Sequence, residues 1–128
     1  MDSYRYIESD DFYDMGCQWL MNKNRQKGED CLLRALELNP CFIHAYIVLA
    51  GLYARQGRFK DSIHLLKKAT RHDPDFDRLH FLMARYAYKN EDYVNAGTFI
   101  SRAIDINPRE LYLLYREAIE GKYRGRRR

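Results

Sequence analysis

The sequence predicts an all-α fold of antiparallel helix pairs, with about seven helices, and three observations support this prediction. The chain of 128 residues contains only three prolines, Pro40, Pro74 and Pro108, and they are spaced 34 residues apart. An alanine lies five residues before each proline, and apolar residues recur at helical spacing between them. A fixed period of this length is typical of a repeat array in which each unit is a helical hairpin.

The period and the composition divide the chain into segments. The chain is long enough to bury a core of its own, and no apolar run approaches the length of a membrane helix. The predicted division is an N-terminal arm of residues 1–8, three units of residues 9–42, 43–76 and 77–110, a capping helix of residues 111–123, and a basic, disordered tail of residues 124–128.

Glycine, asparagine and proline mark the predicted helix ends. Gly57 suits the left-handed residue that ends the first helix of the second unit. Pro74 ends the second helix because proline disfavours helical backbone at the residue before it. In the third unit Asn90 stands near the position of the glycine, and asparagine tolerates left-handed backbone better than most residues. Such short connections predict antiparallel neighbours.

Small residues recur at two positions of the units. We expect Gly16, Ala50 and Ala84 to lie where the two helices of a unit approach closely. Larger side chains there would overpack the crossing, at a cost of about 1–3 kcal/mol each. In the capping helix, Leu111, Leu114 and Ala118 are expected to face back onto the last unit, because a terminal repeat needs its apolar face covered. The second small position, where neighbouring units are expected to touch, is held by Ala35, Ala69 and Ala103.

This pattern resembles the tetratricopeptide repeat, a unit of 34 residues with characteristic aromatic, leucine, alanine and proline positions. The resemblance covers residues 9–110, with departures such as Trp19, His80 and Ala87. It implies a right-handed α-solenoid whose first helices line a concave groove. The second unit matches the pattern best, through Tyr46, Leu49, Ala50, Tyr53, Ala69 and Pro74.

The resemblance also implies which residues line that groove. Its centre is apolar and aromatic and its C-terminal half is basic, which predicts an apolar, partly acidic peptide or helix as the ligand. Only Arg78 could serve in the carboxylate clamp that some members use, so a clamp is not expected. The predicted contact residues are Tyr13, Cys17, Ile47, Val48, Arg55, Arg78, Phe81, Leu82, Arg85, Tyr88, Lys89, Tyr115 and Arg116.

Two alternatives to groove binding stay open. The capping helix, or the N-terminal arm with Tyr4, Tyr6 and Ile7, could fold into the groove and hide these residues. The basic tail could instead bind the phosphates of nucleic acid or of an anionic membrane, or be a solvated end without a role. The tail arginines are Arg124, Arg126, Arg127 and Arg128, and without the tail the chain is close to neutral.

No residue pattern indicates catalysis, a cofactor or a metal. The sequence contains no phosphate-binding loop and no nucleophile elbow. Of the candidate zinc ligands Cys17, Cys31, Cys41 and His44, only the last two have ligand-like spacing. An odd number of cysteines without an export signal predicts reduced thiols and a cytoplasmic protein.

The sequence therefore predicts a non-enzymatic protein-interaction module, either an adaptor or scaffold subunit or a chaperone of one client. Three units and a cap are close to the minimum for an independent array. Self-association through an end face is therefore a further expectation.

Overall fold

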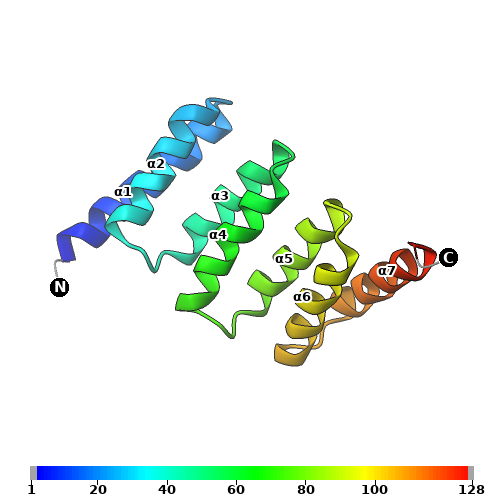
Figure 1. Cartoon of the computed structure of the whole chain (residues 1–128). Coiled ribbons are helices and arrows are strands. Elements are labelled where there is room, and N and C mark those ends of the chain that lie inside the picture. Colours follow the sequence, from blue (N-terminus) through cyan, green and yellow to red (C-terminus); the bar gives the residue numbers. More distant parts are fainter. Residues whose placement is uncertain (1–2, 127–128) are drawn as a thin grey trace. The chain divides into compact units, whose positions relative to one another are not determined.

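The computed structural model describes residues 3–126, and these residues form seven α-helices and no strand (Figure 1). The all-α prediction with about seven helices is confirmed. The second and third predicted units begin at Ile43 and Asp77, where two of the helices also begin. The helices are α1 (Ser3–Met21), α2 (Arg25–Leu38), α3 (Ile43–Arg55), α4 (Phe59–His72), α5 (Asp77–Lys89), α6 (Tyr93–Ile106) and α7 (Glu110–Arg126).

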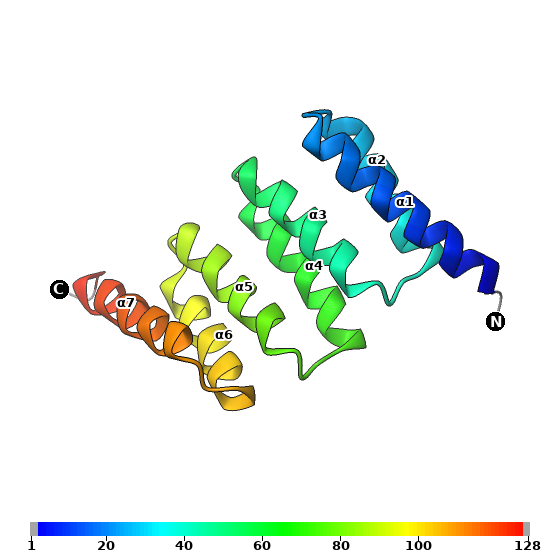
Figure 2. The same ribbon diagram turned by 180° about the vertical axis from the view of Figure 1, so that it is seen from behind.

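The chain divides into two compact units, and the boundary falls within α3. The N-terminal unit is Met1–Leu52, in which α1 packs against α2. The C-terminal unit is Tyr53–Arg128, in which α5 packs against both α4 and α6, and α6 packs against α7 (Figure 2). None of the helices in residues 3–126 is long and apolar enough to cross a membrane.

The turn inside each repeat contains one left-handed residue at the same repeat position. These residues are Lys23, Gly57 and Glu91, with φ of 63°, 76° and 60°. The expectation for Asn90 is wrong, because its φ is −85° and Glu91 adopts the left-handed conformation instead. The strain of a positive φ is offset by backbone hydrogen bonds that close the turn. These bonds run from Asn24 N to Trp19 O (2.8 Å), Arg58 N to Tyr53 O (2.9 Å) and Asp92 N to Ala87 O (2.9 Å).

Each second helix ends two residues before a proline, at Leu38, His72 and Ile106. The residues that follow, Asn39, Asp73 and Asn107, have non-helical backbone, with φ of −139°, −144° and −155°. This conformation is the one that a following proline favours. The N–H of each residue still donates to the carbonyl of the alanine four residues earlier, at distances of 2.9, 3.2 and 3.0 Å. The proline period of the sequence is therefore a period of helix ends.

Two glycines allow α1 and α2 to pack closely. A Cβ atom added to Gly16 would lie 3.0 Å from Cγ of Leu32, which is fully buried, and 3.2 Å from the Gly28 carbonyl oxygen. A Cβ added to Gly28 would lie 2.6 Å from Cδ2 of Leu20 and 3.2 Å from the Gly16 carbonyl oxygen. The expectation of a close helix approach at Gly16 is confirmed.

Replacing Gly28 with alanine is expected to lower the free energy of unfolding by about 1–2 kcal/mol, because overpacking outweighs the gain in helix propensity. The matched control is Gly97→Ala in α6, where the nearest atom to an added Cβ is Cγ2 of Ile119, at 3.9 Å. That variant should be more stable than the wild type by up to about 1 kcal/mol. Urea unfolding followed by circular dichroism measures both changes, and equal effects would contradict the packing described.

The N-terminal arm predicted at residues 1–8 is wrong for its described part, because α1 begins at Ser3. No glycine or proline interrupts the helix before Gly16. Two hydrogen bonds attach this part of α1 to α2: Arg5 Nη2 donates to the Glu37 carbonyl (3.0 Å), and Ser9 Oγ donates to the Ala35 carbonyl (2.8 Å). Tyr4, Tyr6 and Ile7 are exposed on α1 and do not form a separate arm.

The capping helix differs from its prediction in length. The predicted disordered tail is helical as far as Arg126, and Arg127 and Arg128 lie outside the described residues. Arg126 Nη2 lies 3.5 Å from a carboxylate oxygen of Glu91, and its guanidinium lies 4.8 Å from the ring centroid of Tyr93. These contacts to the turn between α5 and α6 and to the start of α6 explain why α7 continues to Arg126.

The capping helix also differs from its prediction in orientation. Tyr112 and Ile119 are the buried residues of α7. Leu111, Leu114 and Ala118, which were expected to face back, are exposed. Both sets have helical spacing, so α7 has two apolar stripes and only one of them faces the rest of the C-terminal unit.

Candidate functional site

We term four exposed cations of the C-terminal unit the basic face. They are Arg55, Arg78, Arg85 and Lys89. Arg55 is the last residue of α3, and the other three residues lie on α5. Arg78, Arg85 and Lys89 are separated by seven and four residues, which places them on one side of a helix. All four residues belong to the set predicted from the sequence.

The environment of Tyr86 shows that three of these arginines lie close together. Burial raises the pKa of the Tyr86 hydroxyl, and the positive charges of Arg85, Arg78 and Arg55 partly offset that rise. Tyr86 is buried, with 8% of its surface exposed. Positive charges from α3 and α5 therefore act on the same phenol and contribute to a positive potential at this surface.

The basic face carries charges that the described residues do not neutralise. No carboxylate among residues 3–126 forms an ion pair with any of its four cations. The nearest acid along α5, Asp77, is engaged elsewhere: the Tyr112 hydroxyl donates to its Oδ2 (2.5 Å), and Arg109 Nε lies 3.4 Å from the same oxygen. An anionic ligand would therefore meet cations without an acidic competitor.

A cluster of aromatic rings lies between α5, α6 and α7. The ring of Phe81 stacks on Tyr112, with centroids 5.0 Å apart, and meets Tyr115 edge to face at 5.0 Å. The ring of Tyr88 meets Tyr115 at 6.4 Å and Tyr93 at 5.6 Å, both edge to face. Pairs of this geometry stabilise packing beyond the area that they bury. The cluster attaches α7 to the unit.

Three predicted contact residues are not where the prediction placed them. Phe81 and Leu82 are buried, with 6% and 4% of their surface exposed, so they are not open anchors. Tyr112 and Tyr115 of α7 cover Phe81. This agrees with the alternative in which the capping helix hides predicted contact residues. Arg116 is exposed but lines a cleft between α6 and α7, whereas the basic face belongs to α3 and α5. Tyr88 and Tyr115 are half-buried aromatic residues.

The predicted contact residues of the N-terminal unit are all half-buried. They are Tyr13, Cys17, Ile47 and Val48. The ring of Tyr13 lies 4.8 Å from that of Phe42, and burial, followed by its interaction with Cys17, raises the pKa of its hydroxyl. Cys17, Cys31 and Cys41 form no disulfide, and residues 3–126 contain no group of three His, Cys, Asp or Glu side chains that could hold a metal ion.

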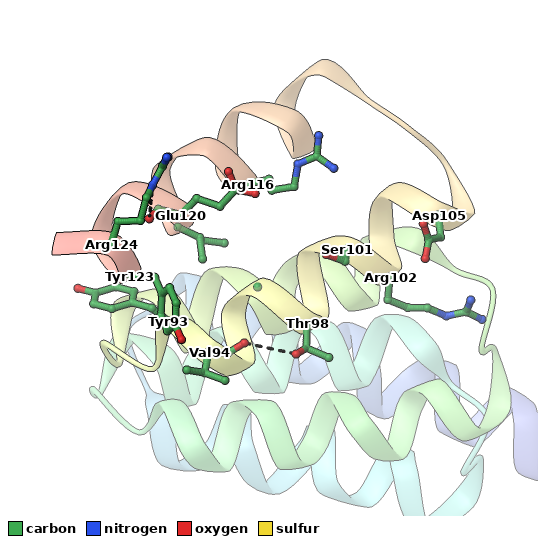
Figure 3. A pocket seen from close by; sticks show the side chains of 12 residues that line it. Tyr93, Val94, Thr98, Ser101, Arg102, Asp105, Arg116, Glu120, Tyr123 and Arg124 are labelled. Carbon is green, nitrogen blue, oxygen red and sulfur yellow. Dashed lines mark hydrogen bonds between the residues drawn. The ribbon is translucent and has the colours of Figure 1, made fainter. Parts of the chain in front are cut away.

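Sequence reasoning missed the cleft between α6 and α7, which has a volume of about 860 Å³ (Figure 3). Tyr93 and Tyr123 lie at one end of the cleft, and Arg102 and Asp105 lie at the other. Gly97 lines the cleft, and a Cβ added to it would lie 3.9 Å from the nearest atom, Cγ2 of Ile119. The glycine was the one signal available in the sequence.

Comparison with known proteins adds family evidence to this geometry. Residues 43–86 match a model of the tetratricopeptide repeat. Together with the helical hairpin of the second unit, this match identifies a tetratricopeptide repeat at residues 43–86. A relative, mouse tetratricopeptide repeat protein 21A, is 32% identical over 74 residues, which cover 56% of this chain and 6% of that protein.

Solved tetratricopeptide repeat structures share the fold at low identity. The first such domain of Spaghetti (RPAP3), bound to the HSP90 peptide SRMEEVD, has a TM-score of 0.80 at 10% identity, covering 96% of each chain. The Yersinia enterocolitica type III secretion chaperone SycD, in complex with a peptide of the translocator YopD, has a TM-score of 0.78 at 13% identity. That match covers 89% of this chain and 93% of SycD.

Proposed function

We propose that this tetratricopeptide repeat protein is a non-enzymatic interaction module, an adaptor or a client chaperone, that binds an acidic segment of a partner protein at the basic face. The observation that carries the proposal is the set of four exposed cations on α3 and α5 without an acidic partner among residues 3–126. Complementary charge on a partner would speed association and select acidic sequences.

The chemistry of the face favours carboxylate side chains. Arginine binds a carboxylate through two parallel N–H···O bonds, and three of the four cations are arginines. Two structures with the same fold hold peptides, and one of these peptides, SRMEEVD, contains three acidic residues and one basic residue. These neighbours make a peptide ligand a reasonable class for this chain, although the ligand itself is our proposal.

Apolar contacts of the partner must come from half-buried residues, since Phe81 and Leu82 are buried. In the C-terminal unit these contacts are Tyr88 and Tyr115. Tyr13, Ile47 and Val48 belong to the N-terminal unit, stay predictions from the sequence, and are not part of the site proposed here. Aromatic rings of this kind are frequent in protein interfaces because they supply contact area at a small entropy cost.

The basic C-terminal residues are a weaker candidate for a binding site. Arg126 lies beside Glu91 and over the ring of Tyr93, and Arg124 Nε donates to the Glu120 carbonyl at 3.4 Å. These contacts occupy both cations within the folded unit. Nucleic-acid or membrane binding would therefore compete with existing interactions, which is why we favour the basic face.

A peptide-display selection on the folded chain tests the proposal. Selected peptides should be acidic with at least one apolar residue, and Arg78→Glu with Arg85→Glu should weaken their binding at least tenfold, which corresponds to about 1.4 kcal/mol. Affinity should also fall as salt is raised, because exposed charges are screened. The matched control reverses two exposed cations of α4, Lys68→Glu and Arg71→Glu, and changes net charge equally.

Fluorescence anisotropy with the selected peptides measures both double variants. The proposal requires the α4 control to bind as the wild type does. It is overturned by neutral or basic selected peptides, by equal losses in the two variants, or by the absence of any selected peptide.

A further inference from the structure

A second apolar stripe of α7 is exposed, although it combines leucines with small residues at the spacing of a helix-packing surface. Leu111 and Leu114 expose 50% and 56% of their surface. Both residues lie on the side of the helix opposite the cleft with α6, because the cleft is lined by Arg116, Ile119 and Glu120. We term this surface the outer stripe, and it consists of Leu111, Leu114, Ala118, Gly121 and Gly125, all exposed.

The repeat period indicates what the outer stripe is suited to contact. Ala118 stands at the repeat position of Gly16, which is three periods of 34 residues earlier. In α1 that position packs against α2, where an added Cβ would meet Leu32 and the Gly28 carbonyl. At Gly121 and Gly125 an added Cβ would meet no atom within 4 Å. Among residues 3–126, no helix covers the stripe. Its exposed leucines are therefore accessible to a helix of another molecule.

The shape of the stripe favours its own copy in the antiparallel direction. The leucines lie at the start of α7, and the alanine and the two glycines lie toward its end. The residues are three and four apart, the spacing at which paired helices interdigitate. When two such helices run antiparallel, each leucine faces a small residue of the partner. In a parallel pair leucines would meet leucines and the glycine ends would leave a void.

Charge favours the same direction. Glu110 begins α7, and Lys122 lies near its end. An antiparallel pair places the acidic start of one helix beside the basic end of the other, and a parallel pair places like charges together. The helix dipoles are also opposed in the antiparallel arrangement.

We propose that the outer stripe binds the outer stripe of a second copy of this chain, as an antiparallel pair of α7 helices related by a two-fold axis. Such an interface is self-complementary, as a two-fold axis requires. One helix pair buries less than a standard interface, so the dimer forms reversibly with rising concentration. The stripe is separate from the basic face, and the proposal does not depend on which partner binds there.

Sedimentation velocity across a range of concentrations tests the dimer with the full chain. The wild type should move from a species of 15.4 kDa toward one of twice that mass. Leu114→Glu should remain monomeric at the concentration at which half of the wild type is dimeric. The matched control is Leu113→Glu, which changes an exposed leucine of the same helix outside the stripe and should dimerise as the wild type does.

A charge exchange tests the direction of the pair. Glu110→Lys alone and Lys122→Glu alone should each weaken the dimer at least fivefold, and an equal mixture of the two variants should restore it. Circular dichroism confirms that each variant is folded. The proposal is overturned by a wild type that is monomeric throughout, by equal losses in the two leucine variants, or by a mixture that does not recover.

Discussion

Replacing Phe81 with alanine is expected to lower the free energy of unfolding by about 3–5 kcal/mol, the usual cost of removing a buried phenylalanine. The ring is 6% exposed and lies against Tyr112 and Tyr115 of α7. Its removal would leave a cavity at the base of α7 and loosen that helix. Urea unfolding followed by circular dichroism measures the loss, and the same variant should refold reversibly at low temperature.

Tyr88→Ala is the control for Phe81, because Tyr88 lies on the same helix and contacts Tyr93 and Tyr115 but is only half-buried. Its loss of stability should be smaller, about 1–2 kcal/mol. If Phe81→Ala kept the stability of the wild type and lost peptide binding, Phe81 would be a contact residue and not a core residue.

Replacing Tyr112 with phenylalanine should lower the free energy of unfolding by about 1.5–3 kcal/mol at pH 7, the range for a hydrogen bond to a charged group. The Tyr112 hydroxyl donates to Oδ2 of Asp77, and both residues are buried. Without the hydroxyl, the Asp77 carboxylate keeps the Arg109 guanidinium, 3.4 Å away, as its one side-chain partner among residues 3–126. Tyr115→Phe is the matched control because no described residue hydrogen-bonds its hydroxyl, and it should change stability little.

The same tyrosine makes stability depend on alkaline pH. Burial, together with the hydrogen bond to Asp77 and the charge of that carboxylate, raises the pKa of Tyr112 to about 12 from an ordinary value of 10.0. Below pH 10 the phenol is protonated in both states and its contribution is complete. Between pH 10 and 12 the unfolded chain loses the proton first, so this contribution to the free energy of unfolding falls as the pH rises.

The difference in stability between the wild type and Tyr112→Phe should therefore shrink as the pH rises through this window. Unfolding curves at pH 9 and at two higher values measure it. Stability curves that stay parallel would show that Tyr112 ionises as easily in the folded chain as in the unfolded one.

Prolines and glycine predicted the helix ends well because each of these residues restricts or frees the backbone at its own position or the one before it. The prolines end helices just before Asn39, Asp73 and Asn107, as expected. Gly57 has the predicted left-handed backbone. Glu91 was missed because the repeat geometry, and not the residue type, imposes its conformation.

The candidate site was harder to predict because exposure depends on packing between helices. The basic face was found, since charged residues on one side of a helix rarely become buried without a partner. Phe81 and Leu111 were assigned in reverse: the first was expected on the surface and is buried, and the second was expected inside and is half exposed. Each residue lies on an apolar stripe of its helix, and periodicity alone does not say which of two stripes faces inward.

The central claim, that the basic face binds an acidic segment, is tested most directly by an NMR titration of the isotope-labelled chain with an acidic peptide from the display selection. If the basic face is the binding site, the largest amide shifts fall on Arg55, Arg78, Arg85, Lys89 and their neighbours in α5. Shifts concentrated at the cleft between α6 and α7, or at the end of α7, with α5 unchanged, would contradict it.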